Sequence, residues 1–480
     1  MEFETVIGLE THVQLSTKSK IFSGSSTEFG AEPNEHIDPV TLGLPGCLPV
    51  LNKTVVEYAM MVGLALNCEI RRDNRFARKH YFYPDLPKGY QISQFEEPIC
   101  ERGHMNIPLE HGMRTVGIKR VHMEEDAGKN IHDSRTHSSL VDLNRAGVAL
   151  LEIVSEPDIR SPGEAAAYLR TLRQIVRFLG ISDGNMEEGS LRCDANISLR
   201  PVGQVKFGTR TEVKNLNSFK FVERALEYEI ARQTALLRSG GKVVQETLLF
   251  DSVTGATRPL RSKEEAADYR YFPDPDLPPL VIEEAWIRSV SERMPTLPEQ
   301  RIKELVEGYG LTQYDAQVLT NERQHIDYFE AVFAVCQNAK LACSWVTSEL
   351  FGALNKAGVE IKSSPVSAQS LGELIKLIDA ETISGKMAKS VFEEMFATGK
   401  PPAEIVEAKG LRQITSVEEI ARVLEDVFAK NASQTADFVA GNDRLQAFFV
   451  GQVMKATGGS ANPKKVNEAI AQALAKRRGS

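Results

Sequence analysis

Residues 7–15 alternate between apolar and polar side chains, which is the pattern of a β-strand with one buried face. The polar face of this predicted strand carries Glu10, His12 and Gln14. A carboxylate and an imidazole fixed side by side on a strand can bind a metal ion or transfer a proton. Taken alone, such a segment is more often an ordinary half-buried strand whose polar face meets solvent.

The same alternation recurs in residues 191–199 and 209–214. The first segment presents Asp194 and Asn196 on its polar face, and the second presents Glu212. Short groups such as aspartate and asparagine hold a fixed geometry more readily than the long side chains typical of a solvated sheet face. The recurrence therefore favours a functional face that several strands share.

The pattern changes near residue 290, which indicates more than one domain. Before it, short alternating stretches and turn signals predict antiparallel strands with interspersed helices, including helices that begin after Ser161 and at Ser218. Beyond Pro298 the apolar spacing is helical, with few strand signals. We therefore predict an α+β fold in which an antiparallel-sheet domain (residues 1–293) precedes an all-α helical domain (294–405) and a small all-α tail domain (406–480).

Composition narrows the classes of function. The chain has 480 residues, a net charge of -8 and six scattered cysteines without a C-x-x-C pair. These features exclude a strongly basic nucleic-acid binder and a zinc ribbon, and they favour a reducing, cytoplasmic compartment. No run approaches 18 apolar residues, so we expect no membrane partner. Residues 455–480 are locally basic, which indicates either a frayed soluble helix or a contact to phosphates.

Two clusters within residues 78–129 suggest chemistry. Glu124, Glu125 and Asp126 repel one another unless a cation such as Mg²⁺ lies among them, although acidic surface turns are common. Residues 78–90 mix cations with aromatic rings, which suits phosphate contacts beside stacking surfaces or, equally, an aromatic loop packed on its own sheet. The usual phosphate-loop, dinucleotide, nucleophile-elbow and H-E-x-x-H signatures are absent from the sequence. Any nucleotide would therefore bind on a sheet surface.

Long ordered matches give the chain a resemblance to a known family. The sequences G-L-E-T-H-V-Q-L, H-Y-F-Y-P-D-L-P-K-G-Y-Q-I-S-Q, M-E-E-G-S-L-R-C-D-A-N and D-Y-R-Y-F-P are among them. Together they resemble the B subunit of tRNA-dependent aspartyl/glutamyl-tRNA amidotransferase (GatB), and the tail resembles the family's YqeY-like domain. The matching segments are residues 8–15, 44–46, 80–94, 122–129, 152–158, 186–196, 212–218, 268–273, 451–455 and 461–463.

This resemblance implies a reaction and a set of partners. The family's "cradle" catalytic domain uses ATP to phosphorylate the side-chain carboxylate of a mischarged Glu-tRNA(Gln) or Asp-tRNA(Asn). Ammonia then displaces phosphate and leaves the amide. The implied partners are a glutaminase of the amidase type, a small bridging protein that completes a heterotrimer, and the mischarged tRNA. The implied cofactors are ATP and Mg²⁺.

The resemblance also implies roles for individual residues. The implied catalytic residues are Glu10, His12, Glu125, Glu152, Asp194 and Glu212. Metal ligands are expected at Glu10, His12, Glu124 and Glu125, and contacts to ATP phosphates or the substrate carboxylate at Lys79, Lys88 and Lys214. No zinc is expected, because the positions where some relatives carry cysteine ligands hold Ser23, Ser25, Asp38 and Thr41.

Two rival hypotheses make different predictions. A stand-alone ATP-dependent ligase for a small metabolite would stay active after deletion of the residues beyond about 295. A non-catalytic tRNA-binding scaffold would be unaffected by Glu10→Ala and Glu125→Ala. Whether the physiological substrate carries glutamate, aspartate or both depends on which synthetases mischarge tRNA in the host.

Overall fold

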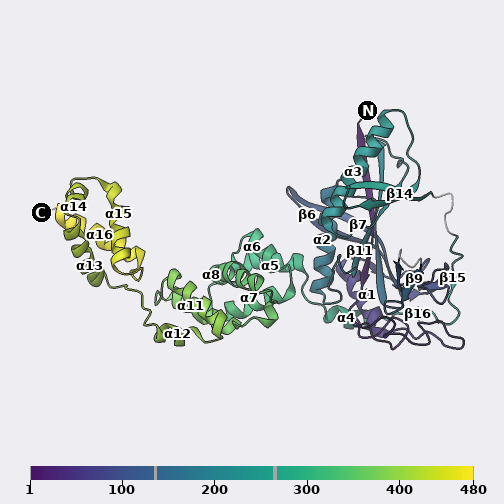
Figure 1. Ribbon diagram of the computed structural model, residues 1–480, viewed down its shortest axis with the longest axis horizontal. Helices are drawn as coiled ribbons and strands as arrows, with labels where there is room; N and C mark the ends of the chain where they lie inside the picture. The colour runs from purple at the N-terminus through teal and green to yellow at the C-terminus, as the bar shows by residue number, and fades with distance from the viewer. Residues whose placement is uncertain (1, 134–137, 263–267, 479–480) are drawn as a thin grey trace. The chain divides into compact units, whose positions relative to one another are not determined.

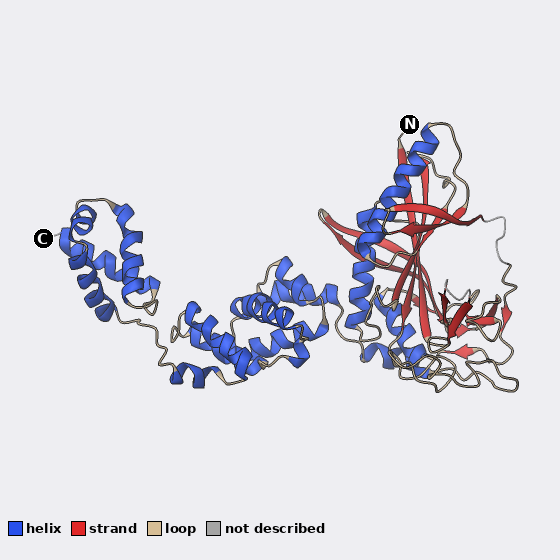
Figure 2. Cartoon of the chain, viewed as in Figure 1, coloured by secondary structure: helices blue, strands red, loops and turns tan. Residues whose placement is uncertain are grey.

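The computed structural model describes residues 2–133, 138–262 and 268–478. The chain divides into two compact units, Met1–Pro298 and Glu299–Ser480. The first is built around one large sheet and the second is helical, as the ribbon diagrams show (Figures 1 and 2). The α+β fold class predicted from the sequence is confirmed.

The sheet of the first unit has the strand order β14-β13-β12-β11-β1-β10-β7-β5-β4-β15. The pair β12–β13 is parallel, and the other pairings among the described strands are antiparallel. The strands on this path are β1 (Phe3–Gln14), β4 (Ala77–His80), β5 (Tyr90–Ser93), β7 (Gly112–Glu125), β10 (Ala149–Ser155), β11 (Leu191–Pro201), β12 (Thr211–Lys214), β13 (Glu246–Asp251), β14 (Ala256–Ser262) and β15 (Phe272–Pro273).

Smaller strand pairs surround this path. Strand β6 (Cys100–Leu109) pairs with both β7 and β2 (Glu69–Ile70). Two short two-stranded ribbons complete the described β-structure. They are β3 (Asp73–Asn74) with β16 (Leu280–Val281), and β8 (Lys129–Asp133) with β9 (Ser138–Asp142).

Helices cover one face of the sheet (Figure 2). They are α1 (Lys53–Ala65), α2 (Pro162–Phe178) and α3 (Phe219–Arg238), and α4 (Glu284–Glu292) packs on α1. Ser161 and Ser218 cap α2 and α3 through side-chain bonds to backbone N–H groups, as their sequence positions predict. Ile7, Leu9 and Val13 of β1 are fully buried in this core. The alternate residues of β1, including Glu10 and His12, therefore face the other side of the sheet.

The second unit consists of short helices with their own apolar cores. In the tail, Ile420, Leu424, Phe428, Phe449 and Ile470 form one such core. No helix in the described part of the chain is both long and apolar enough to span a membrane. The helices are α5 (Pro298–Tyr309), α6 (Gln313–Leu319), α7 (Arg323–Cys336), α8 (Ala339–Ser344), η2 (Trp345–Leu350), α9 (Phe351–Ala357), η3 (Ile361–Ser363), α10 (Ala368–Asp379), α11 (Gly385–Thr398), α12 (Pro402–Ala408), α13 (Val417–Lys430), α14 (Ala432–Val439), η4 (Asp443–Leu445), α15 (Gln446–Ala456) and α16 (Pro463–Arg478).

Candidate active site

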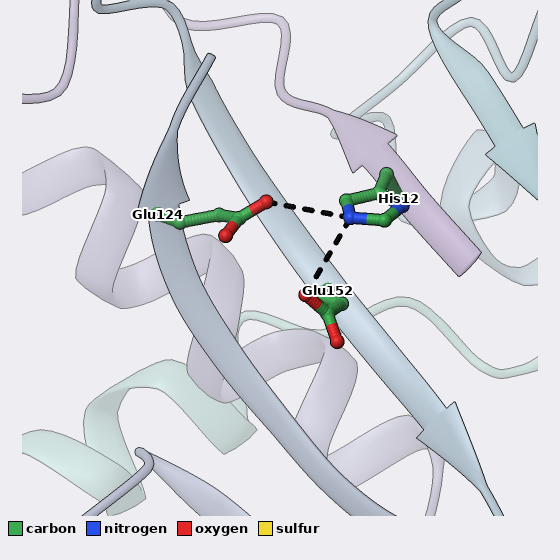
Figure 3. Close-up of side chains that lie close together, drawn as sticks. All are labelled: His12, Glu124 and Glu152. Carbon is green, nitrogen blue, oxygen red and sulfur yellow. Dashed lines mark ion pairs between the residues drawn. The ribbon is translucent and has the colours of Figure 1, made fainter. Parts of the chain in front are cut away.

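His12, Glu124 and Glu152 meet on the face of the sheet that the helices leave uncovered (Figure 3). The Nε2 atom of His12 lies 3.5 Å from Oε1 of Glu124 and 3.5 Å from Oε2 of Glu152. One ligand atom from each side chain lies within 4.8 Å of the other two. We call these three residues the central cluster. Two carboxylates and one imidazole at this spacing form a site that could hold a metal ion.

Strand register explains why the cluster forms. His12 of β1 is the partner of Glu152 on β10, and Glu152 is the partner of His122 on β7. Three neighbouring strands therefore bring one polar side chain each to the same level of the sheet. Glu124 lies two residues beyond His122, so it points to the same face.

His122 is a member of the site to which the sequence prediction gave no role. It is 3% exposed, and its Nε2 lies 3.4 Å from Oε2 of Glu152 and 3.8 Å from Oε2 of Glu124. The two-residue spacing of His122 and Glu124 on one strand face was the available signal. His122 therefore orients both carboxylates of the central cluster.

Each imidazole and carboxylate among these four side chains stabilises the charged form of the other kind. Burial alone would lower the pKa of both imidazoles, but the two carboxylates outweigh it, so the pKa of His12 is raised and that of His122 is raised to about 9. Burial alone would raise the pKa of Glu124 and of Glu152, but the imidazoles hold both below the ordinary value. The carboxylates are thus ionised and attract positive charge, which a divalent cation could supply in place of protons.

A second group lies on β11 and β12, beside β1. Lys214 forms ion pairs with Asp194 and, at 3.0 Å, with Glu212. Burial alone would lower the pKa of its amine, but these pairs outweigh burial and raise it. Glu10 is the register partner of Asp194 and accepts a 2.9 Å hydrogen bond from Asn196. Burial, followed by the nearby charges of Glu152 and Glu212, raises the pKa of Glu10. The structure therefore brings four of the predicted site residues together here, and we call Glu10, Asp194, Glu212 and Lys214 the Lys214 group.

Glu125 lies apart from the central cluster. Consecutive residues of a strand point to opposite faces, and Glu125 accepts bonds from Lys88 Nζ at 2.5 and 2.7 Å and from the Ile92 N–H at 2.8 Å. Lys79 lies on β4, with its Nζ 5.0 Å from the ring centre of Tyr269. Among the described residues, no hydrogen bond or ion pair joins Lys79 to the cluster, so its role stays a prediction.

Comparisons with known proteins place this arrangement in a family. Residues 5–288 match the model of the GatB/GatE catalytic domain, and residues 327–474 match that of the GatB domain. The chain belongs to the GatB family. It is similar to proteins named as the B subunit of aspartyl/glutamyl-tRNA(Asn/Gln) amidotransferase, with 57% identity over 477 residues in Geotalea daltonii (99% of this chain, 100% of the relative) and 55% over 474 residues in Thermodesulfovibrio yellowstonii (99% and 100%).

The GatB match confirms the family inferred from the sequence motifs. It also confirms that the chain is a ligase-type, tRNA-dependent amidotransferase subunit whose reaction depends on ATP. The catalytic-domain match covers the described strands of the large sheet except the first two residues of β1, and it includes the central cluster and the Lys214 group. The GatB fold therefore gathers carboxylates, imidazoles and a lysine on one sheet face, without a phosphate loop.

Proposed function

We propose that the uncovered sheet face around the central cluster is where ATP activates the side-chain carboxylate of tRNA-linked glutamate or aspartate and where ammonia then forms the amide. The observation that carries this assignment is the convergence of Glu124 and Glu152 on the His12 imidazole, each at 3.5 Å. A carboxylate is a poor acyl donor, whereas an acyl phosphate has a good leaving group. The site must therefore stabilise charge on a phosphoryl group as it is transferred.

Magnesium fits the donors of the central cluster. The carboxylates of Glu124 and Glu152 are hard oxygen ligands, and the Nε2 atom of His12 completes the set and would also accept Mn²⁺. A bound Mg²⁺ would supply neutralisation of negative charge on phosphate oxygens. His122 contacts both carboxylates and would hold them in the orientation that binds the ion. Zinc has no place in this proposal.

In this proposal the Lys214 group binds the substrate. Lys214 is held between Asp194 and Glu212, so its ammonium is fixed in direction and can meet an incoming carboxylate or phosphate oxygen. Asn196 fixes the orientation of Glu10 at the edge of the cluster. Burial on the sheet face removes water that would compete with ammonia for the activated carbonyl.

The reaction needs a source of ammonia and a tRNA substrate, and these needs imply further partners. The relatives are each named as a B subunit, which supports a complex with further subunits. We infer a glutaminase (the A subunit) that supplies ammonia and a small bridging protein (the C subunit), in the cytoplasm where charged tRNA is used. The helical unit would contact tRNA, since α16 ends in Lys476, Arg477 and Arg478.

The test reconstitutes this chain with the candidate glutaminase and bridging proteins and supplies glutamine and mischarged tRNA. Amide formation on Glu-tRNA and on Asp-tRNA is followed with ATP present or withheld. We expect amide only with ATP, with one ADP and one phosphate released for each amide, because the carboxylate must be phosphorylated first. Amide formed at an equal rate without ATP would contradict the proposal, and the chain alone should release no ammonia from glutamine.

A further inference from the structure

A groove of about 510 Å³ adjoins the central cluster along β1. Its floor includes Gly8 and Glu10, and its walls carry Lys119 and Arg120 of β7. Phe207 and Arg210, from the segment between β11 and β12, close the other side. We call this groove the basic trough, with three cations in its lining against the two carboxylates of Glu10 and Glu156.

Strand register places the trough beside the reacting groups. Glu10 pairs with Val154, and Val154 pairs with Arg120, so these trough residues lie side by side on three strands. Glu10 is two residues from His12 on β1, and two residues along a strand span about 7 Å. Arg120 also reaches the central cluster directly, with Nη2 at 3.7 Å from Oε1 of Glu152. A ligand in the trough could therefore extend a side chain of a few bonds into the cluster.

Two of the three cations of the trough are available to a ligand, since Arg120 already forms an ion pair with Glu152. Lys119 and Arg210 are exposed, and within the described part of the chain neither has a charged partner. The Nε atom of Arg120 is buried and has no hydrogen-bond partner there. Phe207 is 52% exposed at the rim. Lys119 and Arg210 beside an exposed ring are the combination that binds single-stranded nucleic acid, through phosphates and a stacked base.

The groove at the opposite end of β1 has the reverse charge. It lies beside Gln14, on the far side of His12 from the trough, and has a volume of about 610 Å³. Four carboxylates and two cations line it, so a polyanion is repelled there and attracted to the trough. These residues are Glu28, Asp142, Asp183 and Glu188 against Lys129 and Arg145.

We propose that the basic trough binds the unpaired 3′-terminal nucleotides of the charged tRNA. This proposal rests on the amidotransferase site proposed above and assigns the direction from which its substrate enters. Phosphodiesters lie against Lys119 and Arg210, and a base stacks on Phe207. Strand register puts Arg120 at the level of Glu10, and Arg210 beside Thr211 at the level of Ile7. The cations are therefore spread along β1, which fits a nucleic-acid strand better than a triphosphate. The amino acid on the last nucleotide then points to His12.

The test measures KM for mischarged tRNA and KM for ATP separately in the reconstituted complex. For the Lys119→Ala/Arg210→Ala double variant we expect a higher KM for tRNA and an unchanged KM for ATP. The slope of log KM(tRNA) against log salt should fall by about 1.4, since each lost phosphate contact on a single strand removes about 0.7. Phe207→Ala should raise KM for tRNA roughly 5- to 100-fold through lost stacking.

Matched variants separate charge from folding. Lys242→Ala removes an exposed cation of the same unit outside the trough and should leave both KM values unchanged. Lys119→Arg/Arg210→Lys keeps both charges and should keep the wild-type salt slope. A raised KM for ATP with an unchanged KM for tRNA would overturn the proposal in favour of a nucleotide site, and so would unchanged values of both. Either result leaves ATP-dependent amidation by the wild-type complex intact.

Discussion

Glu152→Gln should lower kcat of the reconstituted complex roughly 100- to 1000-fold, the usual cost of removing one group that stabilises developing charge. Glu152 contacts His12 at 3.5 Å and His122 at 3.4 Å, and the same two imidazoles contact Glu124. Glutamine keeps the size of the side chain and removes the charge that holds a cation. Amide formation at saturating ATP and charged tRNA provides the measurement.

A carboxylate outside the site supplies the matched control. Glu97→Gln makes the same chemical change at a half-exposed residue whose ion pair, among the described residues, is with Arg75 alone, and it should leave kcat within twofold. Thermal unfolding of both variants separates lost chemistry from lost structure. If Glu152→Gln retains a third or more of the wild-type kcat while remaining folded, the non-catalytic scaffold becomes the better hypothesis.

Ending the chain at Pro298 should abolish measurable turnover on charged tRNA. The first unit contains the central cluster and has its own apolar core, so the shortened chain should still fold and bind Mn²⁺. The shortened chain lacks the helical unit, including the basic helix α16. It therefore loses the contacts to tRNA phosphates that raise affinity regardless of sequence. Amide formation is compared for the full and shortened chains, each with its partner proteins.

Two readouts make the deletion informative. Mn²⁺ binding followed by electron paramagnetic resonance should be equal in the full and shortened chains, which shows that the cluster is intact. A second chain ending at residue 405 tests the tail alone and should raise KM for tRNA while retaining some turnover. Undiminished kcat/KM on charged tRNA for the chain ending at Pro298 would refute the need for the helical unit and revive the small-metabolite ligase.

Alternation along single strands was enough to predict part of the site. It placed Glu10 and His12 on one face of β1, and Asp194 and Asn196 on one face of β11, as the structure has them. The α+β class followed from the alternating stretches and interspersed helices before residue 290, together with the helical spacing after Pro298. These inferences needed only local period, which short segments carry in themselves.

The rest depended on pairing between distant segments. Nothing local shows that β7, β10 and β1 are neighbours, so the shared level of His12, Glu152 and His122 could not be read from the sequence. The resemblance named both Glu124 and Glu125 as metal ligands. In the structure Glu124 joins the cluster and Glu125 pairs with Lys88, so a metal role for Glu125 stays a prediction.

The most direct measurement is anomalous diffraction from crystals of the assembled complex soaked in Mn²⁺ and a nonhydrolysable ATP analogue. We expect a manganese peak bonded to His12 Nε2 and to carboxylate oxygens of Glu124 and Glu152, with the terminal phosphate of the analogue beside it. A fully occupied manganese bound to the nucleotide elsewhere on the chain, with these three side chains holding no ion, would contradict the assignment of the site.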